Sequence, residues 1–441
     1  MARSPLRLLG LVALLCFAGI VTSSTTEIQF YSGASGSVTQ YGAPTVGYGP
    51  IFIIGSVNAN LSVPILYCST ECVVAATIPP PPGTSYFGEY LAISGSLIAV
   101  GDSNAGMVSV YSYTVSGTSV AFSPYATLHL GPQYGGIPVA LDGTLLVVGK
   151  SSTNVYNVYD CSSPSCSSVT SLSVSGDDIT NAVSISNGLL SAIFQTPGSC
   201  CAPPIPGVPS AYFFSCSTAG CSSLAGSNVE DGSFVVSVSS NGLVAIGNSE
   251  SAVVSIYQCT NACSSLYQIS SPAAASGYDG FGSSVSFDGS SLAVGAVYGS
   301  GGGNAYLFTC TSTGCVQNGG SFAGQEAGAT IFGTEISLTG SLVAVSDNGY
   351  PTSGYNGAVT IFSYGLSPPP TTHCPAAVYD HATYQATPVG TVGYGSCFHG
   401  YSSPGPQASR PCLAGNIWSA KVSNRCIRTL SFFSFPFILC S

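Results

Sequence analysis

The chain has 441 residues, of which 5% are charged and 45% are hydrophobic, and its formal net charge is −10. The few Lys and Arg residues form no basic patch, which excludes a protein built to bind nucleic acid or anionic lipid. Apolar residues alternate with Ser, Gly and Thr in short stretches, which 54 Gly and 28 Pro separate. This pattern is typical of an all-β protein with many short strands and turns.

The first segment in chain order is a predicted signal peptide at residues 1–24. Arg3 and Arg7 give it a basic start, residues 8–21 form an apolar core, and residues 22–24 are small enough for cleavage. The apolar core is shorter than the roughly 20 residues that a membrane span requires. The 18 cysteines agree with export, because most should pair in an oxidising compartment. We therefore expect a secreted, extracellular protein without a membrane span.

A unit of about fifty residues then recurs seven times, and this repeat decides the expected fold. Residues 281–315, FGSSVSFDGSSLAVGAVYGSGGGNAYLFTCTSTGC, contain three apolar runs, of which the last reaches Cys310. A fourth strand is expected in each connecting segment, which gives the size of one propeller blade. The second run ends, at spacings of 46 to 52 residues, at Gly55, Gly101, Gly149, Gln195, Gly247, Gly295 and Ser346.

The sequence therefore predicts an all-β fold in which residues 27–366 form a seven-bladed β-propeller. The last repeat ends soon after Phe362 and lacks a fourth strand, whereas residues 27–31 form a strand-like fragment before the first repeat. We expect this fragment to become the outer strand of the last blade and to close the ring. An open β-solenoid is the competing architecture.

Dipeptides typical of tight turns join the first and second runs. Two-residue hairpin loops favour them because such loops require positive φ angles. They are Asp142-Gly143, Asn187-Gly188, Asn241-Gly242 and Asp288-Gly289.

The repeats resemble the FG-GAP family over residues 42–364, through FGSSVS-type starts, LAVGA second runs and AYLF-type third runs. The resemblance implies the seven-bladed head found in integrin α chains, where several blades bind calcium. A calcium loop needs an Asp-rich run to surround the ion with oxygen atoms. The corresponding turns here hold only Ser-Gly, Asp-Gly, Asn-Gly or Thr-Gly. We therefore expect no blade calcium, and no metal or other cofactor.

Cysteine pairs follow the third run in five repeats, where each should span a hairpin to the fourth strand. Zinc binding is the alternative for such pairs, but no companion histidine recurs. Cys200 and Cys201 form a vicinal disulfide or pair elsewhere, and both remain open. The five predicted disulfides are Cys68–Cys72, Cys161–Cys166, Cys216–Cys221, Cys259–Cys263 and Cys310–Cys315.

A second module is expected at residues 374–427, after a Pro-rich linker at residues 367–373. Its four cysteines allow three pairings. Together with Trp418 they resemble a Sushi (complement control protein) module, which implies the pairs Cys374–Cys412 and Cys397–Cys426. Modules of this family bind proteins or glycans. The apolar tail, residues 428–441, is expected to be disordered, with Cys440 unpaired.

The residues that carry chemistry form no recognisable catalytic motif. The four histidines have no repeated spacing, and no nucleophile elbow, zinc-protease motif or phosphate loop is present. We therefore expect a non-enzymatic adhesion or recognition protein whose partner is an extracellular protein or glycan. Its binding surfaces would be the Sushi-like module and long propeller loops, on which Tyr298, Tyr350 and Tyr355 are candidate ligand contacts. Asn60 begins a glycosylation sequon, Asn-Leu-Ser.

The alternative function is a secreted, glycosidase-like hydrolase that uses a pair of carboxylates at the mouth of the propeller. Acidic residues occur in several repeats, although at different positions. Two of them within about 10 Å in one pocket would favour this alternative. The candidates are Asp177, Asp178, Glu230, Asp231, Asp279 and Asp347.

Overall fold

The structure is a computed structural model in which the chain forms two compact units, Met1–Gly365 and Leu366–Ser441. In the first unit it describes residues 26–32, 41–56, 61–69, 71–131, 136–150, 155–173, 179–195, 209–225, 229–230, 235–273, 279–299, 301–324, 331–349 and 357–364. In the second unit it describes only short strands between residues 373 and 428. Within the described residues all regular structure is β-strand, and no helix is long and apolar enough to span a membrane.

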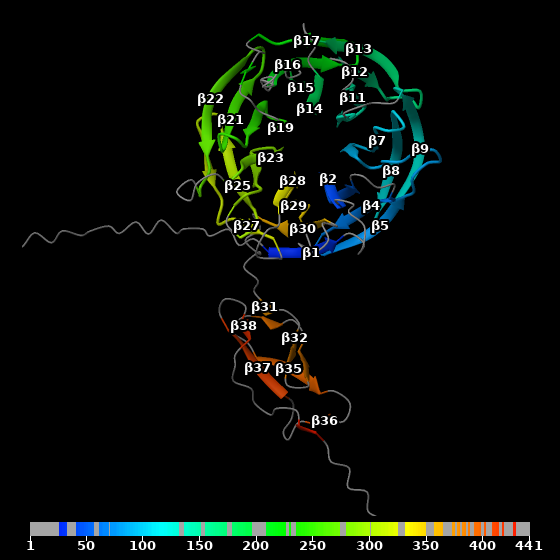
Figure 1. Cartoon of the computed structure of the whole chain (residues 1–441). Coiled ribbons are helices and arrows are strands. Elements are labelled where there is room, and N and C mark those ends of the chain that lie inside the picture. Colours follow the sequence, from blue (N-terminus) through cyan, green and yellow to red (C-terminus); the bar gives the residue numbers. More distant parts are fainter. Residues whose placement is uncertain are drawn as a thin grey trace, which may run out of the picture. The chain divides into compact units, whose positions relative to one another are not determined.

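The first unit is a seven-bladed β-propeller, as the repeat predicts (Figure 1). Six blades are antiparallel sheets of four sequential strands with the first strand nearest the axis, and two of these six carry an extra short strand. Blade 1 is β2 (Tyr41–Tyr48), β3 (Ile51–Ser56), β4 (Val63–Cys68) and β5 (Cys72–Ile78). Blade 2 is β6 (Tyr90–Ser94), β7 (Leu97–Asp102), β8 (Met107–Ser116) and β9 (Ser119–His129). Blade 3 is β10 (Val139–Asp142), β11 (Leu145–Lys150), β12 (Val155–Asp160) and β13 (Ser167–Ser173).

The next three blades repeat this order. Blade 4 is β14 (Ile179–Ser186), β15 (Leu189–Gln195), β16 (Pro209–Ser217) and β17 (Gly220–Ser223), with the short β18 (Val229–Glu230) also on β16. Blade 5 is β19 (Val235–Val238), β20 (Leu243–Asn248), β21 (Val253–Cys259) and β22 (Cys263–Ser270). Blade 6 is β23 (Phe281–Asp288), β24 (Ser291–Ala296), β25 (Asn304–Thr311) and β26 (Gly314–Gln317), with β27 (Phe322–Ala323) also on β25.

Blade 7 combines the two ends of the repeat region. It consists of β28 (Phe332–Thr339), β29 (Leu342–Asp347) and β30 (Ala358–Ser363), with β1 (Thr26–Ser32) as its outer strand. β1 pairs antiparallel with β30, from Thr26 opposite Ser363 to Ser32 opposite Ala358. The predicted closing strand is therefore confirmed, and the last blade gains a partner for an edge that would otherwise be open.

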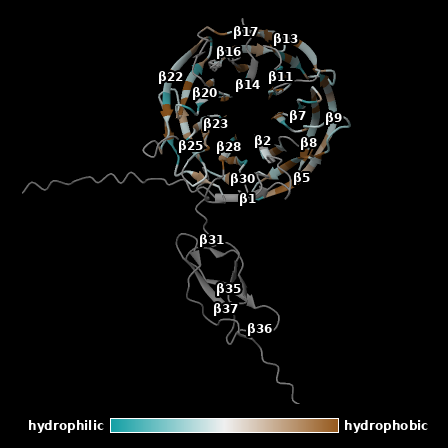
Figure 2. Cartoon of the chain, in the orientation of Figure 1, coloured by the Kyte–Doolittle hydropathy of each residue, from teal (hydrophilic) through white to brown (hydrophobic). Residues whose placement is uncertain are grey.

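Seven clusters of buried apolar side chains lie between the blades, one at each junction. The cluster that joins blade 7 to blade 1 contains Phe52 and Ile54 on one side and Val359 and Ile361 on the other. Because this junction is as apolar as the other six, the ring is closed, and the open solenoid is excluded. Hydrophobic and hydrophilic residues alternate along strands such as β9 and β22 at the outside of the ring (Figure 2).

Glycines explain why the repeat contains an FG pair and a second run that ends in VG. Gly88 lies just before β6 and Gly333 lies near the start of β28. Their φ angles of 94° and 93° are ones that L side chains rarely adopt. The carbonyl oxygens of these two glycines lie directly against Gly55 and Gly295 of the preceding blades. A Cβ atom at Gly55 or Gly295 would collide with that oxygen, so the two glycine positions let adjacent blades pack backbone to backbone.

The hairpin turns differ in part from the predicted form. Only Asn187-Gly188 has positive φ at both residues, 50° and 74°. Asp142 pairs with Leu145, and Asp288 pairs with Ser291, so each Asp is the last strand residue and the Gly is the first loop residue. A glycine at the first loop position is typical of a type II′ turn. The acidic side chains are thereby held at the ends of the innermost strands.

Disulfides join the five cysteine pairs of the hairpins between third and fourth strands: Cys68–Cys72, Cys161–Cys166, Cys216–Cys221, Cys259–Cys263 and Cys310–Cys315. They also belong to the hydrophobic core. Cys68, Cys161 and Cys310 are at most 1% exposed, and each packs in the cluster shared with the preceding blade.

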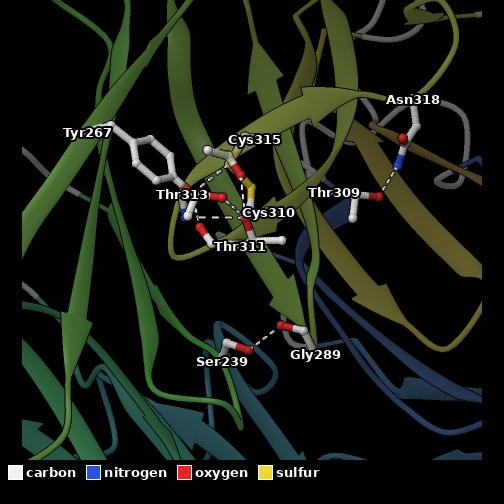
Figure 3. The surroundings of a disulfide bond; sticks show 10 residues. Ser239, Tyr267, Gly289, Thr309, Cys310, Thr311, Thr313, Cys315 and Asn318 are labelled. Atoms are coloured by element: carbon white, nitrogen blue, oxygen red, sulfur yellow. Dashed lines mark hydrogen bonds between the residues drawn. A yellow bond between two sulfur atoms is a disulfide. The ribbon is translucent and has the colours of Figure 1, made fainter.

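Tyrosines of the preceding blade hold two of these hairpins. The Tyr125 hydroxyl donates to the Cys161 carbonyl oxygen at 3.0 Å. The Tyr267 hydroxyl donates to the Thr311 carbonyl oxygen beside the Cys310–Cys315 disulfide (Figure 3). The hairpins therefore connect neighbouring blades as well as the two strands of one blade.

The described residues of the second unit form three small sheets. They are formed by β31 (His373–Cys374) with β34 (Thr387–Pro388); by β32 (Ala377–Tyr379), β33 (Ala382–Tyr384), β35 (Val392–Cys397), β37 (Ala408–Leu413) and β38 (Ile417–Trp418); and by β36 (Tyr401–Ser402) with β39 (Ile427–Arg428). The side chains of Cys374, Cys397, Cys412 and Cys426 lie outside the described residues, so the Sushi-like pairings remain predictions.

Candidate functional site

A cavity with a volume of about 520 Å³ lies on the propeller axis. All seven innermost strands (β2, β6, β10, β14, β19, β23 and β28) contribute to its wall. Its lining includes the turn residues Gly95, Gly143 and Asp288, so it extends to the face that carries the turns between first and second strands. Because strand directions alternate within a blade, this face is opposite to the loops that join second and third strands, such as the loop between β24 and β25 that carries Tyr298.

Serines of the innermost strands connect neighbouring blades along the cavity. Ser184 Oγ accepts the backbone N–H of Val238 at 3.0 Å. Ser237 Oγ accepts that of Phe287 at 2.9 Å, and Ser286 Oγ accepts that of Leu338 at 2.9 Å. The first strand of each blade has no neighbouring strand on its axial side. Its backbone groups that face the axis therefore need other hydrogen-bond partners. The serines in the VSIS, VSVS and VSF motifs supply those partners.

A second set of contacts links the turns at the end of the cavity. Gly143 N–H donates to Ser94 Oγ at 2.9 Å, and Gly188 N–H donates to Asp142 Oδ2 at 2.7 Å. Hydrogen bonds of the same kind link turns of the other blades. Gly340 N–H donates to Asp288 Oδ2, and the Asn187 side chain donates to the Ser240 carbonyl oxygen. Ser239 Oγ donates to the Gly289 carbonyl oxygen, and Thr339 Oγ1 donates to the Gly49 carbonyl oxygen. These bonds fix the positions of the polar groups around the cavity.

The charge of the lining is one-sided. It contains the carboxylates of Asp142 and Asp288 and no Lys, Arg or His. The same imbalance holds for the whole propeller sequence, since Lys150 is the single Lys or Arg between residues 26 and 365. A negative cavity of this kind disfavours anionic ligands. Tyr48, which is 45% exposed, adds an aromatic ring to the lining.

The acidic residues that the sequence analysis named for a hydrolase do not meet in this cavity where they are described. Asp279 and Asp347 are buried, with exposures of 2% and 3%. Asp279 Oδ1 accepts Phe281 N–H at 3.0 Å, and Asp347 Oδ1 accepts Ile331 N–H at 3.1 Å. Both carboxylates therefore support the start of an innermost strand. Asp177, Asp178, Asp231 and the side chain of Glu230 lie outside the described residues.

Blade 2 holds a carboxylate pair that sequence analysis missed. Asp102 is fully buried, and its carboxylate accepts backbone N–H groups from Ser85, Tyr86 and Ala105 at 2.8 to 3.0 Å. Glu89 accepts the hydroxyl of Ser103 nearby. Burial, together with the neighbouring charge of Asp102, raises the pKa of Glu89. The two acids lie in different parts of the repeat, so only the fold shows that they interact.

Of the three predicted ligand contacts, the structure describes only Tyr298. Tyr298 is 60% exposed and does not line the axial cavity. Tyr350, Tyr355 and the sequon residue Asn60 lie outside the described residues. The axial serines could have indicated this cavity from the sequence, because Ser recurs at one position of the first run in several repeats.

The calcium chemistry of FG-GAP blades does not fit these turns. The turn regions provide at most one carboxylate each, whereas calcium requires six or more oxygen ligands. Both Asp142 and Asp288 already use one oxygen atom for a backbone N–H of the next blade. Within the described ranges, no three His, Cys, Asp or Glu side chains form a group that could hold a metal ion.

Comparisons with known proteins show similarity of fold alone. No family model and no curated protein matches the sequence. A chain of the mitotic checkpoint complex is 12% identical, with a TM-score of 0.47, and the match covers 77% of this chain and 95% of that one. Hsv2 from Kluyvelomyces marxianus is 9% identical, with a TM-score of 0.44 and coverage of 72% and 92%. A Lactobacillus plantarum protein is 14% identical, with a TM-score of 0.41 and coverage of 74% and 92%.

Proposed function

We propose that this protein is a non-enzymatic recognition protein that is exported from the cell and binds an extracellular protein or glycan. The observation that carries this proposal is the axial cavity of about 520 Å³, whose polar groups are fixed by bonds between blades. A rigid scaffold around a cavity is a common basis for ligand binding. The propeller fold is compatible with such a role.

Two features support export. The sequence begins with a predicted signal peptide, and five disulfides lie within the propeller. Disulfides persist in oxidising compartments and are rare in the cytosol. We further propose that the repeats are FG-GAP-like and that the second unit is a Sushi-like module that provides another binding surface.

The test is an array of extracellular-matrix proteins and glycans, probed with the chain from residue 25 onward. We expect selective binding to a small set of ligands, unaffected by a metal chelator. Absence of binding to every protein and glycan would contradict a recognition function. A reducing, cytosolic location of the native protein, measured by fractionation with thiol labelling, would contradict export.

A secreted hydrolase is the second candidate, and the interaction of Glu89 with Asp102 favours it. A carboxyl group with a raised pKa close to a second acidic side chain is a common acid–base arrangement. However, Asp102 is held by three backbone N–H groups, so its oxygens are largely occupied. Assays on a panel of chromogenic glycosides decide between the candidates. Turnover that disappears in Glu89→Gln would support hydrolysis, and absence of turnover would favour recognition.

A further inference from the structure

The axial cavity offers hydrogen-bond donors at fixed positions. The hydroxyl oxygens of Ser94, Ser184, Ser237 and Ser286 each accept a backbone N–H from the next blade. A hydroxyl group that accepts through its oxygen still has its own hydrogen to donate. Within the described part of the chain, none of these four hydrogens is donated to another protein group. All four serines line the cavity.

The same cavity offers acceptors. Asp142 and Asp288 use Oδ2 for the N–H groups of Gly188 and Gly340. Among the contacts of the described residues, Oδ1 of each carboxylate accepts no hydrogen bond from the protein. An ionised carboxylate accepts only. Hydroxyl donors and carboxylate acceptors at fixed positions therefore line the same cavity.

This mixture discriminates between ligand classes. An anion would face two carboxylates without any cation in the lining, which is unfavourable. A cation would satisfy the carboxylates but would leave the serine hydrogens without an acceptor, and unpaired buried polar groups reduce affinity. A neutral ligand with several hydroxyl groups both donates and accepts, so it matches the two sets of groups together.

An aromatic ring completes this chemistry. Tyr48 is 45% exposed and lines the cavity beside Gly47. A sugar ring presents an apolar face of C–H groups, which packs on a flat aromatic surface, while its hydroxyl groups point to the sides. Tyr combines a flat apolar face with a polar tip. The cavity volume is within the range of roughly 300–1,000 Å³ that is usual for small-ligand sites.

We propose that the axial cavity binds a neutral sugar residue of a glycan, with Tyr48 against the ring and the serines and Asp142 and Asp288 on its hydroxyl groups. This inference rests on the proposed recognition function and names the ligand class of the same site. It assigns binding to the turn face rather than to the long loops.

Calorimetric titration of the chain with three ligand sets tests the inference. The sets are neutral monosaccharides and disaccharides, the anionic sugars glucuronate and sialic acid, and the cationic amide of arginine. We expect at least one neutral sugar to bind at least ten-fold more tightly than any anionic sugar or the arginine amide. Tighter binding of the cation or of an anionic sugar would overturn the proposal.

Two pairs of matched variants locate the site. Asp142→Asn keeps an oxygen for Gly188 N–H but replaces the free acceptor with a donor, and we expect at least ten-fold weaker sugar binding. Asp160→Asn removes the same charge in an outer hairpin and should bind like the unaltered protein. Tyr48→Ala should also weaken binding, whereas Tyr298→Ala should not. Thermal unfolding verifies that each variant is folded.

The outcomes separate this inference from the proposed function. Binding to a matrix protein on the array, without any sugar affinity, would overturn the sugar site and keep the recognition function. Sugar binding that is unchanged in both Asp142→Asn and Tyr48→Ala would move the site elsewhere and overturn the assignment to the cavity. If neither the array nor the titrations detected binding, both the sugar site and the recognition function would be contradicted.

Discussion

Glu335 on β28 is a half-buried carboxyl group whose environment affects stability. Burial raises its pKa from 4.5 to about 7, because loss of solvent disfavours the charged form. The folded protein then holds a proton that the unfolded chain has lost between these two values. The free energy of unfolding should therefore fall as the pH rises from about 4.5 through 7.

Glu335→Gln should remove this pH dependence, because an amide carries no charge at any pH. We expect little change at pH 4 and an increase in the free energy of unfolding of up to about 3 kcal/mol at pH 8. Urea unfolding of the variant and the unaltered protein at both pH values measures this change in the free energy of unfolding. Glu71→Gln, in an exposed hairpin, is the control for loss of one charge. Equal effects of Glu335→Gln at both pH values would contradict the mechanism.

Gly295 tests the backbone contact between blades. A Cβ atom there would collide with the carbonyl of Gly333 and with Ser284 Oγ. We expect Gly295→Ala to destabilise the propeller by about 1–3 kcal/mol, the usual cost of overpacking. Gly314→Ala is the control, because a Cβ atom at Gly314 meets nothing within 4 Å. Similar melting temperatures for the two variants would show that the blades can separate without cost.

At the scale of the element, the disulfide-linked hairpins should contribute to the free energy of unfolding. Each closes a loop so short that the entropic contribution should be about 2 kcal/mol, but Cys310 is also fully buried. The double variant Cys310→Ser/Cys315→Ser places a hydroxyl where the cluster of blades 5 and 6 is apolar, so it should destabilise more than Cys310→Ala/Cys315→Ala. Denaturant unfolding of both variants measures the difference. Equal stabilities would mean that only loop closure matters.

At the scale of the whole molecule, closure of the ring depends on the outer strand β1. Removing residues 26–32 would expose the edge of β30 and take away the six residue pairs between the strands. We expect a lower melting temperature and association between molecules, because an open strand edge pairs with other chains. Light scattering and calorimetry check this. A synthetic peptide of residues 26–32 should restore both properties, and failure to do so would point to a general loss of folding.

Several elements were predictable from short-range patterns. The FG and LAVG motifs, the cysteine spacing and the missing fourth strand of the last repeat indicate seven blades, hairpin disulfides and closure by residues 27–31. These features depend on residues within one repeat or on counting repeats. The turn geometry was only partly predictable, because Asp142 and Asp288 lie at strand ends, a position that the sequence of the dipeptide does not determine.

By itself, then, the sequence determined the strand content, the repeat number and the cysteine pairs of the propeller, because periodicity and spacing act locally along the chain. Only the tertiary structure decided that Ser184, Ser237 and Ser286, about fifty residues apart from one to the next, meet at one axis. It also placed Asp142 and Asp288 in the same cavity and Glu89 beside Asp102. A ring brings equivalent positions of all repeats together, and no single repeat contains the site that they form.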